Sequence, residues 1–143
     1  MSALAIFHVD DSAADALLFQ VAVELEGLSS LIQHVTDGQA ALDYLRDISN
    51  DLPGLMLLDL GMPGMSGLDV LAEIQKDPRL AKVPVIVLSS SRDEHDIEHS
   101  YRLGANAYIV KPSGMDGFKT MVKTIDQFWF RTATLPRARV RSD

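Results

Sequence analysis

The stretch that ends in Asp59 limits the fold more than any other part of the chain. Four apolar residues, Leu55 to Leu58, run directly into this carboxylate, and the loop after it is rich in glycine and proline. A short apolar run between turn residues is typical of a strand that is buried on both faces in a parallel sheet. An unpaired carboxylate is costly inside such a strand, but at the carboxyl end it lies where open α/β sheets bind their ligands. We therefore expect Asp59 to lie open at the end of a central strand.

Size, charge and composition exclude several classes of protein. The chain has 143 residues, which most simply form one domain, and its net charge of −7 argues against direct nucleic-acid binding. The absence of cysteine excludes disulfides and thiolate metal sites. The sequence has no apolar run of about 18 residues and no signal-peptide pattern, so we expect a cytoplasmic protein that does not enter a membrane.

The hydrophobic pattern predicts five strands that alternate with five helices. The expected strands are residues 4–9, 31–35, 55–58, 84–88 and 107–110. The expected helices begin near Ser12, Asp37, Ser66, Asp93 and Met115. In the first helix the apolar residues at helical spacing are Leu17, Leu18, Val21, Ala22, Leu25 and Leu28. Such alternation is typical of a single doubly wound α/β domain with a parallel sheet.

Polar residues follow several of these strands directly. Right-handed crossovers put all strand ends at one edge of the sheet, which would gather Asp10, Asp11, Asp59, Ser89 and Lys111. Three carboxylates in one cleft repel one another unless a cation lies among them, and Mg²⁺ prefers such oxygen ligands. A lysine and a hydroxyl group next to a metal-bound carboxylate are suited to phosphoryl transfer to an aspartate.

The ordered set of these motifs resembles the receiver domain of two-component response regulators. The motifs are Asp10-Asp11, Asp59 with Met62-Pro63-Gly64, Ser89, Tyr108 and Lys111-Pro112. The resemblance covers roughly residues 4–130, and it implies a (βα)₅ flavodoxin-like domain over residues 1–130 with strand order 2-1-3-4-5. The arginine-bearing tail, residues 131–143, is too short to bury a core of its own, and we expect it to be part of an interface.

The resemblance also implies how the carboxylates act. Asp59 would accept a phosphoryl group from a sensor histidine kinase, while Mg²⁺ would be held by Asp10, Asp11, Asp59 and the backbone carbonyl of Gly61. Lys111 would pair with the phosphoryl oxygens. The chain would then be a single-domain signalling phosphoacceptor in a phosphorelay, not an enzyme, and only its own phosphorylation and dephosphorylation would be expected.

The switch residues are likewise implied by the resemblance. Ser89 and Ser90 would contact the new phosphoryl group, and Tyr108 would turn inward as Ser89 moves. The peptide bond between Lys111 and Pro112 would be cis, which proline permits at low cost. Phosphorylation would alter the surface built from the fourth helix, the fifth strand and the fifth helix.

Within receivers, the chain looks most like the stand-alone regulators of phytochrome-type sensor kinases. The features behind this are the loop from Gly61 to Gly67, residues 103–108, and the aromatic run at residues 128–130. In the last helix, Phe118, Met121, Val122, Ile125, Phe128 and Trp129 follow the core spacing. Phe130 falls off this stripe, so we predict a homodimer contact through the last helix and tail that includes Trp129 and Phe130.

Two other functions fit the same fold class. A Mg²⁺-dependent phosphatase with an aspartyl-phosphate intermediate would need an acid/base aspartate two residues after Asp59, where this chain has Gly61. A flavodoxin-like cofactor-binding module would need a phosphate cradle after the first strand, where the carboxylates of Asp10 and Asp11 would repel phosphate.

The histidines suggest at most a weak second metal site. His95 and His99 are spaced i, i+4 on one helix, but their acidic neighbours favour an ordinary solvated face. His8 lies on the same strand face as Asp10, and we interpret it as a core histidine with its hydrogen bonds satisfied.

Overall fold

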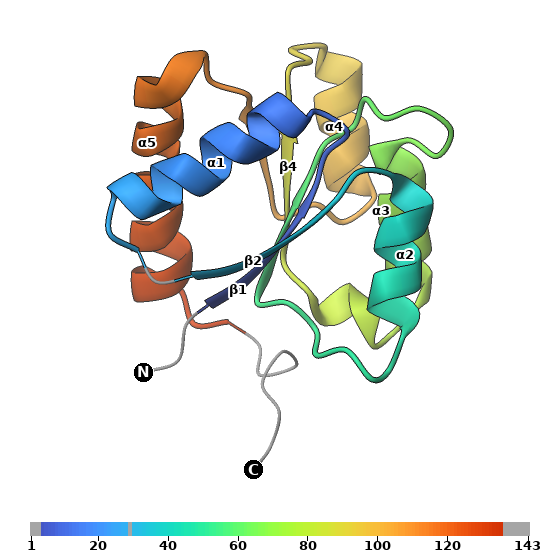
Figure 1. Cartoon of the computed structure of the whole chain (residues 1–143). Coiled ribbons are helices and arrows are strands. Elements are labelled where there is room, and N and C mark those ends of the chain that lie inside the picture. The colour runs from blue at the N-terminus through green and yellow to red at the C-terminus, as the bar shows by residue number, and fades with distance from the viewer. Residues whose placement is uncertain (1–3, 29, 136–143) are drawn as a thin grey trace.

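Five parallel strands form the centre of the molecule, and α-helices cover both faces of the sheet (Figure 1). The computed structural model describes residues 4–28 and 30–135. The strands are β1 (Leu4–Val9), β2 (Ser30–Val35), β3 (Leu55–Leu58), β4 (Val85–Ser89) and β5 (Ala107–Val110). The helices are α1 (Ala13–Leu25), α2 (Gly38–Arg46), α3 (Gly67–Lys76), α4 (Glu94–Arg102) and α5 (Gly114–Ile125). The strand order β2-β1-β3-β4-β5 confirms the predicted doubly wound, flavodoxin-like fold.

The register of the sheet brings the predicted site residues together. Val9 of β1 is paired with Leu58 of β3, so Asp10 and Asp59 follow these neighbouring strands at the same edge. The backbone N–H of Asp59 donates to the Val9 carbonyl at 2.9 Å, which fixes this end of the strand pair. On the other side of β3, the Lys111 N–H donates to the Ser89 carbonyl at 2.8 Å. The carboxyl ends of four strands therefore hold the site.

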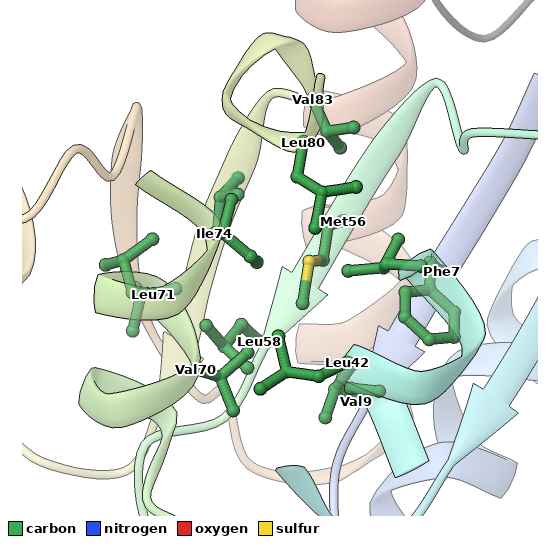
Figure 2. Close-up of a cluster of buried hydrophobic side chains, with 14 of the residues drawn as sticks. Phe7, Val9, Leu42, Met56, Leu58, Val70, Leu71, Ile74, Leu80 and Val83 are labelled. Carbon is green, nitrogen blue, oxygen red and sulfur yellow. The ribbon is translucent and has the colours of Figure 1, made fainter. Parts of the chain in front are cut away.

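Two apolar cores lie on the two faces of the sheet. Because side chains alternate along a strand, Met56 and Leu58 of β3 pack under α2 and α3 (Figure 2), whereas Leu55 and Leu57 pack under α1 and α5. All four residues of β3 are fully buried, as the continuous apolar run predicts. None of the helices within the described ranges is both long enough and apolar enough to cross a membrane.

Only part of the predicted apolar stripe of α1 faces the core: Ala22 is buried, and Leu18 packs against the core. Its buried residues are Ala16, Phe19, Ala22 and Val23, while Leu17 and Leu25 are each 60% exposed. Both stripes have helical spacing, so periodicity alone does not decide between them. Phe19 decides the orientation in the structure, where its ring packs at 5.2 Å from the ring of the buried His8.

The last helix changes its geometry at Asp126. Helix α5 ends at Ile125, and residues Asp126–Thr132 continue as a π-helix, in which the Ala133 N–H donates to the Phe128 carbonyl. Each π turn takes up an additional residue, which rotates the following side chains relative to an α-helix. As a result Phe128 is 51% exposed, whereas Trp129 and Phe130 pack against the core under α1 and α5. The prediction that Phe128 is a core residue and Phe130 lies off the core was therefore wrong.

Candidate functional site

Three carboxylates converge at the carboxyl edge of the sheet. Oxygens of Asp10, Asp11 and Asp59 lie within 4.8 Å of one another. Asp10 is fully buried and Asp59 is 6% exposed, while Asp11 is open to solvent. The buried oxygen Asp10 Oδ2 has no hydrogen-bond partner among the described residues. The donor atoms are all oxygens, and Asp10 Oδ2 is held by an ion pair with Lys111 and, within the described ranges, not by a hydrogen bond. Such a donor set fits a hard divalent cation such as Mg²⁺.

Lys111 balances part of this negative charge. Its ammonium nitrogen lies 2.9 Å from Asp10 Oδ2 and 3.5 Å from Asp59 Oδ2. A third carboxylate, Asp15, is closer still, with Oδ2 at 2.7 Å from the same nitrogen. Burial alone would lower the pKa of Lys111, but these carboxylates outweigh it and raise the pKa above its ordinary value. The lysine is therefore a permanent cation at the centre of the site.

Sequence reasoning missed Asp15 as a site residue. We interpreted it only as a helix-start residue, and its backbone N–H does donate to the Ser12 hydroxyl at 3.1 Å. That bond fixes the first turn of α1, and the turn carries the Asp15 carboxylate to Lys111. The contact joins residues 96 positions apart in the sequence. No local pattern distinguishes such a carboxylate from an ordinary first-turn aspartate.

The two buried carboxylates have opposite electrostatic environments. Burial raises the pKa of Asp10, but contacts with His8, the Ser12 N–H and Lys111 outweigh it and lower the pKa to about 2. Burial also raises the pKa of Asp59, and there the more distant Lys111 does not compensate for burial and for the Asp10 charge. Asp10 is thus held ionised, whereas Asp59 carries a less stable negative charge that favours a cationic or electrophilic partner.

The hydroxyl residues after β4 form a short hydrogen-bond chain beside Asp59. The Ser89 side chain is buried and accepts from the Ser91 N–H at 3.2 Å. The Ser91 hydroxyl donates to Asp96 at 2.6 Å, and the Tyr108 hydroxyl donates to the Ser91 carbonyl at 2.8 Å. Ser90 is exposed at the same edge. A cavity of about 370 Å³ is lined by Asp59, Leu60, Gly61, Ser66, Leu68, Ser89, Ser90, Ser91 and Asp96.

The loop after Asp59 holds α3 tightly against the site. Ser66 and Asp69 form a capping box at the start of α3. A Cβ atom at Gly67 would clash with the Asp59 carbonyl oxygen, so only glycine permits this close approach. At Gly61, by contrast, a Cβ would meet nothing within 4 Å. The loop thus closes one side of the site with backbone and leaves the other side open.

The family model of the response regulator receiver domain matches residues 6–123. The chain belongs to this family. The receiver is 37% identical over 137 residues to the response regulator Rcp1 of Synechocystis, with 93% of each chain covered. It is also 37% identical over 127 residues to the probable methanogenesis regulatory protein FilR2 of Methanothrix harundinacea. The aligned region covers 87% of this chain and 82% of FilR2.

Solved structures give the same result. The phosphorylated cyanobacterial phytochrome response regulator RcpA is 43% identical to this receiver, with a TM-score of 0.87 and coverage of 94% and 99% of the two chains. The Mn²⁺-bound form of Rcp1 is 36% identical, with a TM-score of 0.84 and coverage of 93% and 99%. The phosphatase alternative is not favoured by these relatives, and Gly61 offers no side chain for the acid/base step that it requires.

The receiver differs from the sequence predictions at Pro112 and at its histidines. The described residues contain no cis peptide bond, so the predicted cis bond before Pro112 is wrong; proline allows both isomers at similar energy. His8 is a core residue, but the prediction that its hydrogen bonds are satisfied is wrong, because neither ring nitrogen has a partner among the described residues. Its Nε2 lies 3.6 Å from Asp10 Oδ2, which is longer than a hydrogen bond but close enough for the electrostatic contact that helps to lower the pKa of Asp10.

His95 and His99 are neighbours on α4, with ring centroids 5.7 Å apart. No third potential ligand joins them in the part of the chain that the structure describes. The pair therefore remains a feature of a polar helix surface.

Proposed function

We propose that Asp59 accepts a phosphoryl group from a sensor histidine kinase in a Mg²⁺-dependent reaction. The observation that carries this proposal is the combination of Lys111 at 3.5 Å from Asp59 with the cluster of Asp10, Asp11 and Asp59 at the same edge. In the reaction, a carboxylate oxygen of Asp59 attacks phosphorus and the bond from phosphorus to the kinase histidine nitrogen breaks. The histidine leaves as the neutral ring once its nitrogen has taken a proton from water.

The chain's own groups would assist at defined points. Mg²⁺, bound by the three carboxylates and the Gly61 backbone carbonyl, would neutralise charge on the transferring phosphoryl group. Lys111 would bind a second phosphoryl oxygen, since its ammonium already lies beside Asp59. The buried position of Asp59 excludes most water and strengthens these electrostatic contacts.

The same proposal includes a switch after β4. The Ser89 hydroxyl accepts from the Ser91 N–H, so its own proton is available for a phosphoryl oxygen, and exposed Ser90 can add its backbone or hydroxyl. Movement of Ser89 would pull on Ser91, whose carbonyl is bonded by Tyr108 of β5. The signal would thereby reach the surface formed by α4, β5 and α5.

The decisive experiment is intact-mass measurement after incubation with acetyl phosphate and Mg²⁺. We expect the native chain to gain one phosphoryl group, Asp59→Asn to gain none, and Asp116→Asn, an exposed first-turn aspartate of α5, to behave like the native chain. A gain of equal size in Asp59→Asn would refute Asp59 as the acceptor.

We further propose that the kinase is of the phytochrome type and that it docks over α1. The relative RcpA is described as a phytochrome response regulator. Leu17 and Leu25 are each 60% exposed on α1, the helix that also carries Asp15 into the site. An apolar face next to the acceptor suits a helical partner. Because the kinase takes its phosphoryl group from ATP, the proposal also places the receiver in the cytoplasm.

The proposed homodimer uses the last helix, with a revised contact residue. Trp129 and Phe130 pack inward, so Phe128 supplies the exposed ring. It borders an apolar groove along the edge strand β5 that is lined by Asn106, Ala107, Ile109, Thr124, Ile125, Phe128 and Trp129. Residues 136–143 of the tail, also part of the predicted interface, lie outside the described residues.

Light scattering after size exclusion tests the homodimer. Phe128→Asp should lower the solution mass to that of a monomer. Leu31→Asp, which changes an exposed leucine on the opposite edge strand β2, should not. An unchanged mass for Phe128→Asp would exclude this contact.

A further inference from the structure

Lys111 contacts three carboxylates, and its shortest contact is to a residue outside the metal ligands. The distances from Nζ are 2.7 Å to Asp15, 2.9 Å to Asp10 and 3.5 Å to Asp59. The Lys111 side chain is only 12% exposed and that of Asp15 is 28% exposed. The pair is therefore largely shielded from water, in contrast to ordinary surface ion pairs.

We propose that Asp15 is a positioning residue that draws Lys111 away from the metal ligands until a phosphoryl group on Asp59 takes the lysine over. This inference rests on the proposed function and assigns to Asp15 a role in the same site. Asp15 acts only through Lys111 and does not itself touch the reacting atoms.

The first argument concerns the metal ion. Lys111 and a divalent cation compete for the same carboxylates, because Asp10 lies 2.9 Å from the Lys111 ammonium through Oδ2 and also belongs to the acidic cluster. Asp15 offers the ammonium group an alternative partner outside the cluster. If Asp15 loses its charge, the carboxylates that remain beside Lys111 in the described part of the chain are those of Asp10 and Asp59. The cation then meets stronger competition for two of its three carboxylates.

The second argument concerns the phosphoryl group. Lys111 lies 3.5 Å from Asp59 Oδ2, so a phosphoryl oxygen on Asp59 comes within reach after a small movement of the ammonium group. The phosphoryl group carries more negative charge than a carboxylate. In this proposal, the movement of Lys111 toward that oxygen lengthens its 2.7 Å contact with Asp15. Asp15 therefore opposes the phosphorylated state, and its removal should favour that state.

These two arguments predict effects of opposite sign for Asp15→Asn. We expect Mn²⁺, followed by electron paramagnetic resonance, to bind at least about fivefold more weakly to the variant, the lower end of ordinary coupling between linked sites. We expect beryllium trifluoride, a phosphoryl mimic followed by ¹⁹F NMR at saturating Mg²⁺, to bind more tightly by a similar factor. Asp15→Glu keeps the carboxylate, so this variant should bind both probes with affinities closer to those of the native chain than Asp15→Asn does.

Two controls separate this role from other effects. Asp116→Asn removes a first-turn aspartate of α5, and both affinities should stay within about twofold of the native values, as for an exposed charge that salt screens. In a Lys111→Ala background, Asp15→Asn should change Mn²⁺ affinity by less than about twofold, because the effect passes through the lysine. If Asp15→Asn weakened Mn²⁺ binding equally with and without Lys111, Asp15 would act only as a distant negative charge. That result would overturn the proposal.

The remaining outcomes are also decisive. Weaker binding of both probes by Asp15→Asn would show a merely structural role for Asp15, and unchanged binding would show none. If the native chain binds Mn²⁺ but neither binds beryllium trifluoride nor gains a phosphoryl group, the proposed function fails. The Mn²⁺ comparison in the two Lys111 backgrounds then decides alone whether Asp15 positions the lysine.

Discussion

Asp10→Asn and Asp59→Asn should change the stability of the metal-free receiver in opposite directions. The pKa of Asp10 is lowered, so its ionised form stabilises the folded chain at every pH above the ordinary value of 3.8, and this contribution is lost as the pH falls through about 2. The pKa of Asp59 is raised, so its ionised form destabilises the folded chain at neutral pH. Replacement of each carboxylate by a neutral amide therefore removes a stabilising charge in one case and a destabilising charge in the other.

The size of the Asp10 effect follows from its pKa. A shift from 3.8 to about 2 corresponds to about 2 kcal/mol in the free energy of unfolding at neutral pH, because each tenfold change in an equilibrium is worth about 1.4 kcal/mol. For a domain of this size the loss lowers the unfolding temperature by roughly 5–10 °C. The Asn side chain can still accept from the Ser12 N–H, which Asp10 Oδ1 bonds at 2.8 Å, so the loss reports mainly on charge.

Thermal and urea unfolding at pH 7.5 in EDTA measure both variants. Asp10→Asn should unfold at lower temperature than the native chain, and Asp59→Asn at higher temperature. Mg²⁺ at ten times its dissociation constant should then stabilise the native chain by about 1.4 kcal/mol and both variants by less. An exposed control, Asp43→Asn on α2, should unfold close to the native chain under all conditions.

The reasoning fails if both variants shift in the same direction in EDTA. Destabilisation by Asp59→Asn would mean that its contact with Lys111 outweighs its burial. Stabilisation by Asp10→Asn would mean that Lys111 and its neighbours do not compensate for the burial of Asp10.

Three further predictions concern the same edge of the sheet. Because its pKa is raised, Asp59 is protonated at a higher pH than an ordinary aspartate. As the pH is lowered, Mn²⁺ affinity should therefore begin to fall at a higher pH than expected for a carboxyl group of pKa 3.8. A pH titration of Mn²⁺ binding followed by electron paramagnetic resonance measures this. Gly67→Ala should destabilise the chain by roughly 1–3 kcal/mol through overpacking against the Asp59 carbonyl, whereas Gly61→Ala, in open space, should cost less than about 0.5 kcal/mol in urea unfolding. Tyr108→Phe should cost about 1 kcal/mol and increase hydrogen exchange in the loop around Ser91, because it removes the 2.8 Å bond to that carbonyl; unchanged exchange would contradict the coupling.

The sequence predicts the sheet and the acidic cluster well because both depend on short-range patterns. Each central strand is a continuous apolar run, and parallel topology then brings Asp10, Asp59 and Lys111 to one edge without knowledge of the helix packing. The position of Ser89 at this edge is predicted for the same reason, because Ser89 is the last residue of β4.

The features that the sequence did not predict depend on contacts between distant segments. Asp15 reaches Lys111 across 96 positions, and its local pattern is that of a helix start. Phe19 packs against His8 and faces the core. Leu17 and Leu25 also have helical spacing, but they face the solvent.

The π-helix between Asp126 and Thr132 sets which aromatic ring is exposed, and it does so without changing the residues around Asp59. A regular continuation of α5 would turn Phe130 away from the core. The additional residue in the π turn exposes Phe128 in its place. The change takes place beyond Ile125, at the far end of the last helix from Lys111. A one-residue insertion or deletion there would change which ring is exposed while the carboxylates and the lysine stay in place. In the proposed homodimer, such a change would alter the contact residue and leave the residues around Asp59 as they are.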